Sequence, residues 1–78
     1  MSISTKIKAL LSLCEKDHAG LAEYFGISKQ ALSNKFYRGS FSAEDLIKAA
    51  DFCGCTLTFT TPSGDTIKLE PTDIQKED

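Results

Sequence analysis

The sequence contains no apolar run close to the ~20 residues that a membrane-spanning helix needs, although 41% of its 78 residues are hydrophobic. Behind the two lysines of its first eight residues, it also lacks the apolar segment and small-residue cleavage site of a signal peptide. Three cysteines, an odd number, do not fit a secreted scaffold held by disulfides. We therefore expect a cytoplasmic protein, and a chain this short predicts one small domain over residues 1–78.

Basic residues are not in excess, because the net charge is −2 and the isoelectric point is near 5.3. The acidic residues, however, are concentrated at the end of the chain. Residues 65–78 hold five acids and two lysines, a balance of −3, whereas residues 1–64 hold seven bases and six acids, a balance of +1. No acidic residue occurs between Glu23 and Glu44. This segment carries only basic charge, as a surface that binds an anionic partner would.

Helical periodicity begins near the start of the chain. A first helix is predicted from residue 3 to about Lys16, with one apolar face made of Ile3, Ile7, Leu10, Leu11 and Cys14. Asp17 is positioned to cap a short second helix. Gly26 is expected to end that helix, because glycine adopts the left-handed conformation without strain.

Two further helices are predicted. Ser28 caps the third helix, which ends at Gly39. Ser42 caps the fourth, with Asp45 in the position of a capping box and Gly54 at the end. The residues expected to be buried in these two helices are Leu32, Phe36, Leu46, Ile47, Ala50 and Cys53.

The apolar period changes from 3.6 to 2 after the fourth helix. Apolar residues alternate with polar ones on both sides of the turn sequence Pro62-Ser-Gly-Asp65, which predicts a β-hairpin over about residues 56–70. Residues 71–78 are expected to form a frayed acidic tail. Two strands alone are marginally stable, so the apolar side chains of the hairpin need a partner surface. These side chains are Leu57, Phe59, Ile67 and Leu69.

The second and third predicted helices have the spacing of a helix-turn-helix. Ala22 is small where the helices cross, Gly26 follows four residues later at the turn, and Leu32 follows after six more to anchor the third helix. The sequence Leu-Ala-Glu-Tyr-Phe-Gly-Ile-Ser-Lys-Gln-Ala-Leu-Ser-Asn-Lys that starts at Leu21, and the later Arg-Gly-Ser from Arg38, resemble the Cro and lambda-repressor-like helix-turn-helix family. The resemblance covers residues 5 to about 55.

The resemblance implies a mainly α (α+β) domain of four to five helices, followed here by the C-terminal β-hairpin. It also implies dimers that bind double-stranded DNA, with the third helix in the major groove. By position, it assigns base reading to Lys29, Gln30, Ser33 and Asn34. It assigns phosphate contacts to His18, Ser28, Lys35, Tyr37, Arg38, Gly39 and Ser40.

The side-chain chemistry of the predicted third helix favours the same function independently of the family resemblance. The amides of Gln30 and Asn34 suit adenine, and the Lys29 ammonium suits the acceptors of guanine. An ordinary solvated helix has the same polar stripe, and for an isolated segment that interpretation would be preferred. The added spacing of alanine, glycine and leucine favours DNA binding.

Two alternatives based on cysteine and histidine are weaker. Cys14, His18, Cys53 and Cys55 have the ligand types of a zinc site, but their spacing is unlike that of known zinc motifs. Cys14 and His18 also form a possible nucleophile pair, with no third group to orient them. We therefore expect no metal, no cofactor and no enzymatic activity.

The sequence thus predicts a sequence-specific DNA-binding protein, a small repressor-like transcriptional regulator of a bacterium, phage or mobile element. We expect a homodimer, with the hairpin as the first candidate for the contact, although the hairpin equally fits a cover for the core of a monomer. No membrane partner and no small-molecule ligand are evident. The alternative is a protein-interaction module, such as an antitoxin or an adaptor with the same fold.

Overall fold

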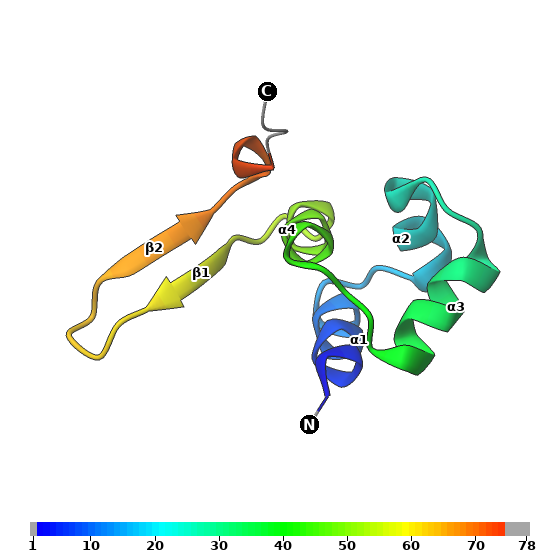
Figure 1. The fold of residues 1–78 in the computed structure, drawn as a ribbon, viewed down its shortest axis with the longest axis horizontal. Helices are drawn as coiled ribbons and strands as arrows, with labels where there is room; N and C mark the ends of the chain where they lie inside the picture. The colour runs from blue at the N-terminus through cyan, green and yellow to red at the C-terminus, as the bar shows by residue number, and fades with distance from the viewer. Residues whose placement is uncertain (1, 75–78) are drawn as a thin grey trace.

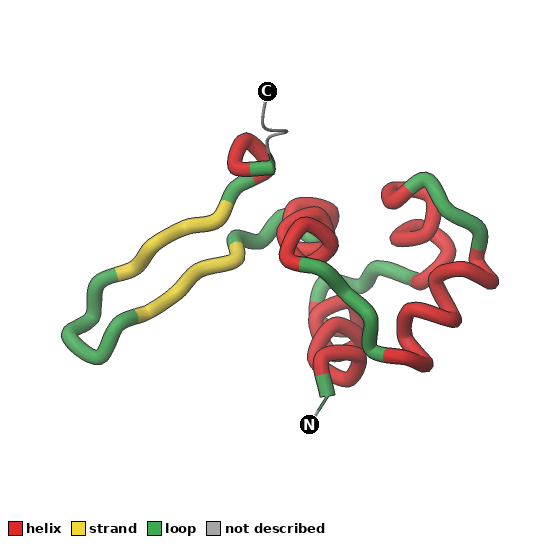
Figure 2. Tube along the Cα trace, in the orientation of Figure 1, coloured by secondary structure: helices red, strands yellow, loops and turns green. Residues whose placement is uncertain are grey.

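The computed structural model describes residues 2–74, in which four α-helices are followed by a two-stranded antiparallel sheet (Figures 1 and 2). This arrangement confirms the predicted mainly α domain with a C-terminal hairpin. The elements are α1 (Ile3–Leu13), α2 (His18–Phe25), α3 (Lys29–Arg38), α4 (Ala43–Phe52), β1 (Leu57–Thr60), β2 (Thr66–Leu69) and the 3₁₀ turn η1 (Pro71–Asp73).

Each α-helix starts at a side-chain cap. The capping oxygen accepts a hydrogen bond from the backbone N–H three residues later, which satisfies one of the free donors of the first turn. At α4 the Asp45 carboxylate also accepts the backbone N–H of Ser42, so the predicted capping box is confirmed. The four caps are Ser2, Asp17, Ser28 and Ser42.

The first helix ends earlier than the sequence suggested. The helix stops at Leu13 rather than near Lys16, because Glu15 adopts a left-handed conformation with φ 58°. The Lys16 N–H then donates to the carbonyl of Leu11 at 2.9 Å, which closes the helix as a C-terminal glycine usually does. A glutamate in this position gives no sequence signal, and this explains the wrong boundary.

The turn between α2 and α3 depends on Gly26, whose φ is 75°. The next residue, Ile27, donates its N–H to the carbonyl of Ala22 at 3.0 Å, so the chain reverses within two residues. Apart from its two chain neighbours, no residue of the described range 2–74 has an atom within 4 Å of a β-carbon placed at Gly26. Glycine is therefore favoured here by its backbone conformation and not by crowding.

The core is formed where the four helices meet. Its buried residues are Ile7, Leu11, Leu21, Ala22, Leu32, Phe36 and Ala49. Two polar or small residues also hold the helices together, and the sequence did not reveal either role. The buried Ser4 hydroxyl of α1 donates to the carbonyl of Phe36 at 2.6 Å. Gly20 of α2 packs so closely on α4 that a β-carbon there would lie 3.0 Å from the Phe52 ring.

The hairpin projects from the helical body and meets it through α4 (Figure 1). Its strands pair with Leu57 opposite Leu69 and Phe59 opposite Ile67. Leu57 and Leu69 at the base are half-buried, whereas Phe59 and Ile67 are 62% and 58% exposed. The apolar face of the hairpin therefore does not cover the core of its own chain.

The segment after the hairpin is partly ordered. Residues 71–73, expected to belong to a frayed tail, form η1, in which the Asp73 carboxylate accepts the Glu70 N–H at 2.7 Å. This turn contacts α4. The remainder of the predicted tail, residues 75–78, lies outside the described residues.

Candidate nucleic-acid interface

Helix α3 presents the predicted base-reading side chains on one exposed side. Leu32 and Phe36, spaced one turn apart, are buried against the core and fix the rotation of the helix. Gln30 and Asn34 are also one turn apart, and the Gln30 amide donates to the Asn34 side-chain oxygen at 3.4 Å. The four predicted residues that α3 exposes are Lys29, Gln30, Ser33 and Asn34.

The positive charge of this surface is not neutralised by the protein. Within residues 2–74, neither Lys29 nor Arg38 has a carboxylate within 4.0 Å. Arg38 lies in the last turn of α3, next to Tyr37, whose side chain is 91% exposed. Both ends of α3 therefore offer unpaired cations, which is the electrostatic requirement for contact with a phosphate backbone.

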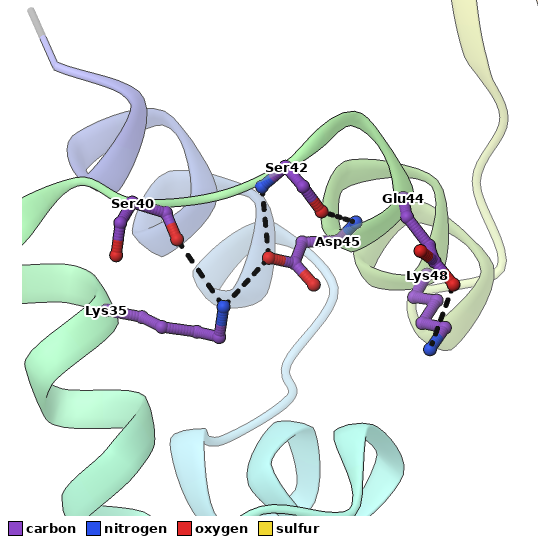
Figure 3. Close-up of polar contacts among 6 residues, drawn as sticks. All are labelled: Lys35, Ser40, Ser42, Glu44, Asp45 and Lys48. Carbon is purple, nitrogen blue, oxygen red and sulfur yellow. Dashed lines mark hydrogen bonds and ion pairs between the residues drawn. The ribbon is translucent and has the colours of Figure 1, made fainter.

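Lys35, assigned by position to a phosphate, has partners inside the protein. Its ammonium lies 2.9 Å from the Asp45 carboxylate and donates to the carbonyl of Ser40 at 3.4 Å (Figure 3). The side chain joins α3 to the first turn of α4. Lys35 is therefore less available to DNA than Lys29 or Arg38.

Three other predicted phosphate contacts lie at the ends of α3 and shape them. The Ser28 hydroxyl caps the helix by accepting the Ala31 N–H at 3.0 Å. At the opposite end, Gly39 has a φ of 66°, and the Ser40 N–H donates to the carbonyl of Lys35 at 3.1 Å. All three residues are exposed, so they lie at the surface while they terminate the helix.

His18 begins α2 and stacks on the ring of Phe36, with centroids 4.9 Å apart and planes inclined by 24°. A shallow depression of about 260 Å³ lies beside this pair, and its wall includes Ser33 and Tyr37 of α3. The wall also includes Lys8 of α1, whose ammonium lies 5.4 Å from the centroid of Phe36. The structure thus joins His18 to the exposed face of α3.

Lys8 was missed by the sequence analysis. It lies one turn after Ser4, the residue that bonds to α3, so the same side of α1 faces the third helix. Periodicity alone does not separate Lys8 from Lys6, because both fall between the apolar positions of α1. The distinguishing signal is the buried hydroxyl of Ser4, which only the tertiary structure reveals.

The residues considered for zinc do not assemble. The sulfurs of Cys14 and Cys55 are 3.7 Å apart, but the His18 ring lies on Phe36. Among residues 2–74, no three His, Cys, Asp or Glu side chains come together as metal ligands. The hydrogen bond to Cys14 raises the pKa of the Cys55 thiol, with smaller contributions from desolvation and charge repulsion. The two thiols are therefore partners of each other rather than parts of a larger cluster.

Comparison with protein families matches residues 12–65 to the bacteriophage CI repressor helix-turn-helix domain. The chain belongs to this family. The matched segment contains α2 and α3 with the Gly26 turn between them, as well as α4 and β1. No curated protein and no solved structure gives a match.

Membership in the CI repressor family confirms the resemblance drawn from the residues of α2 and α3. It supports a DNA-binding helix-turn-helix of the type found in transcription regulators. In the described part of the chain, no helix combines the length and apolar character needed to cross a membrane.

Proposed function

We propose that this CI repressor family domain is a sequence-specific DNA-binding protein that regulates transcription as a repressor-like protein of a bacterium, phage or mobile element. The observation that carries the proposal is the exposed face of α3. It combines Lys29, Gln30 and Asn34 without any acidic group from residues 24–43. A helix of this kind, held by a helix-turn-helix, reads base edges in the major groove.

The proposed roles follow from side-chain chemistry. Gln30 and Asn34 recognise adenine through their amides, Lys29 recognises guanine, and Ser33 lies beside them. Phosphate contacts are best supported where a donor is exposed and has no partner among residues 2–74, as at Arg38 and Tyr37. His18 and Lys8 flank the depression beside α3 and fit a second phosphate.

The proposed regulator acts in the cytoplasm as a homodimer, without a metal, cofactor or small-molecule ligand. One helix-turn-helix reads only a few base pairs, whereas two copies address half-sites about 34 Å apart. The exposed apolar face of the hairpin supports a contact between copies. The residues proposed for this contact are Leu57, Phe59, Ile67 and Leu69.

Selection of bound sites from a pool of random duplexes tests the proposal. We expect one enriched sequence with two related half-sites, and binding to it that weakens steeply as salt concentration rises. A pool with no enriched sequence after selection would contradict sequence-specific reading. Lys48→Ala provides a control for charge, because Lys48 lies on α4 rather than on α3 and pairs with Glu44 at 3.7 Å.

The exposed hairpin also favours a second candidate function, a protein-interaction module such as an antitoxin or adaptor. Such a protein would bind its partner through the face of Phe59 and Ile67, and α3 would not bind DNA. Measurement of DNA affinity against salt separates the two functions, because an adaptor that does not neutralise phosphates has no salt-dependent DNA binding.

A further inference from the structure

The hairpin carries an uncovered apolar surface. Phe59 and Ile67 lie opposite each other in the register and are more than half exposed. Alternate residues of a strand point to opposite faces, so Leu57 and Leu69 share the face of Phe59 and Ile67. The other face holds only Thr58, Thr60, Thr66 and Lys68. One face of the hairpin is therefore apolar and uncharged, and only contact with a partner surface would remove it from water.

A groove of about 220 Å³ lies at the base of this hairpin, between α1 and α4. The lining of the groove is mostly apolar, and among the described residues 2–74 Lys6 is the only charged side chain in it. The principal apolar residues are Ile7, Leu10, Leu46, Ala49, Ala50 and Leu57. The groove is thus an apolar surface of the kind that the apolar face of the hairpin needs as a partner.

Leu57 belongs to both surfaces. It lines the groove, and it lies two residues before Phe59 on the same face of β1. The apolar lining therefore continues from the helices onto the hairpin. Figure 1 shows the hairpin pointing away from the helices, so the hairpin does not fold back over the groove of its own chain.

We propose that two copies of the chain exchange these surfaces, so that the hairpin of each copy lies in the α1–α4 groove of the other. This inference rests on the proposed function, for which it specifies the dimer contact. A two-fold axis makes both contacts at once, which doubles the buried area in a domain too small to bury all its apolar surface. Neither apolar surface brings like charges together, because the hairpin face is uncharged and the groove contains only Lys6.

The exchange leaves the candidate DNA surface free. No residue of α2 or α3 lines the groove, and in Figure 1 α3 and the hairpin lie on opposite sides of α4. Two copies joined through their hairpins therefore keep both third helices exposed. This is the arrangement that two half-sites require.

Sedimentation equilibrium without DNA tests the contact. We expect the wild type to dimerise, and Phe59→Asp and Leu10→Asp each to weaken the dimer by at least about 30-fold, because each places a charge in an apolar contact. Thr58→Asp is the matched control: it adds the same charge to the same strand on the opposite face, and should leave the dimer unchanged. A monomeric wild type at high concentration would overturn the proposal.

Mixing the two defective variants distinguishes the exchange from a simple contact between hairpins. In a mixed dimer, the intact hairpin of Leu10→Asp lies in the intact groove of Phe59→Asp, so one of the two contacts is restored. We expect the mixture to dimerise more tightly than either variant alone. If Leu10→Asp dimerises by itself as strongly as the wild type, the groove is not part of the interface and the proposal is wrong.

Nuclear Overhauser effects between a labelled and an unlabelled wild-type copy give a result that does not depend on a variant folding. The exchange predicts contacts between the Phe59 ring and the methyl groups of Leu10 and Leu46 in the other copy. Contacts of Phe59 only with Ile67 of the other copy would overturn it. These measurements use no DNA, so failure of the dimer contact is distinguishable from failure of base-specific binding by an intact dimer.

Discussion

The ammonium of Lys35 lies 2.9 Å from the carboxylate of Asp45, and that carboxylate also accepts the Ser42 N–H at 3.0 Å. One acidic side chain therefore completes the capping box of α4 and holds the last turn of α3. The same turn carries Tyr37 and Arg38. The ion pair thus ties the helical turn that carries two proposed phosphate contacts to α4.

The Asp45 interactions should make stability depend on pH. Burial alone raises the pKa of Asp45, but the Ser42 N–H and the Lys35 ammonium outweigh it and hold the pKa below its usual 3.8. The unfolded chain therefore binds the proton more readily than the folded one, and the stabilisation is present above pH ~4 and lost as the pH falls through the lower folded pKa. Urea denaturation should show Asp45→Asn destabilised by about 1 kcal/mol at pH 6.

At pH 3 the difference between Asp45→Asn and the wild type should shrink. Every other carboxyl group is common to the two proteins, so subtracting their stability profiles isolates Asp45. A difference that stays constant from pH 6 to pH 3 would mean that the pKa of Asp45 is the same in the folded and unfolded chains, so that its ionisation does not contribute to stability.

Lys35 and Arg38 should differ in their effect on DNA binding. Arg38→Ala should weaken binding to all sequences and lower the slope of log K against log salt by about one unit, because Arg38 has no carboxylate partner among residues 2–74 and its exposed guanidinium suits a phosphate. Lys35→Met should change this slope less and lower the free energy of unfolding instead. Titrations at several salt concentrations, paired with denaturation, measure both effects. Equal slopes for Lys35→Met and Arg38→Ala would show that Lys35 leaves Asp45 to contact DNA.

Gln30 and Asn34 should determine sequence preference. Replacing either with Ala should weaken binding to the selected site by about 1–3 kcal/mol and leave non-specific binding nearly unchanged, since base contacts specify and phosphate contacts position. Because the two amides hydrogen bond to each other, their effects should not add fully. Competition titrations with specific and random duplexes measure the ratio of specific to non-specific affinity. A double variant that retains the preference of the wild type would assign base reading to other residues.

Local signals explain what could be predicted from the sequence. The Ser42 capping box and the Gly26 turn each depend on residues that are neighbours in the chain, so their roles are visible without a structure. The orientation of α3 followed from the spacing of Leu32 and Phe36 for the same reason. These features position the candidate DNA surface, which is why its exposed residues could be identified in advance.

Long-range contacts explain which features could not be predicted from the sequence. Lys35 has the charge of a phosphate contact, and only the approach of Asp45 from α4 shows its other role. Lys8 became part of the candidate surface only through the packing of α1 on α3. No local pattern indicates the role of Gly20, whose lack of a side chain admits the Phe52 ring. Each case depends on residues distant in sequence.

At Gly26, backbone conformation and steric crowding predict different effects of substitution. The φ of Gly26 is 75°, and a β-carbon there would meet no atom within 4 Å from the rest of residues 2–74, its chain neighbours aside. Any loss of stability on substitution should therefore come from the backbone alone. Gly26→Val should therefore lower the free energy of unfolding by more than about 1 kcal/mol, since a β-branched residue opposes positive φ. Gly26→Asn, which is larger than alanine but tolerates this conformation, should cost less. Chemical denaturation of both variants measures which of them lowers the free energy of unfolding more. If Asn costs as much as Val, side-chain size rather than φ limits this turn.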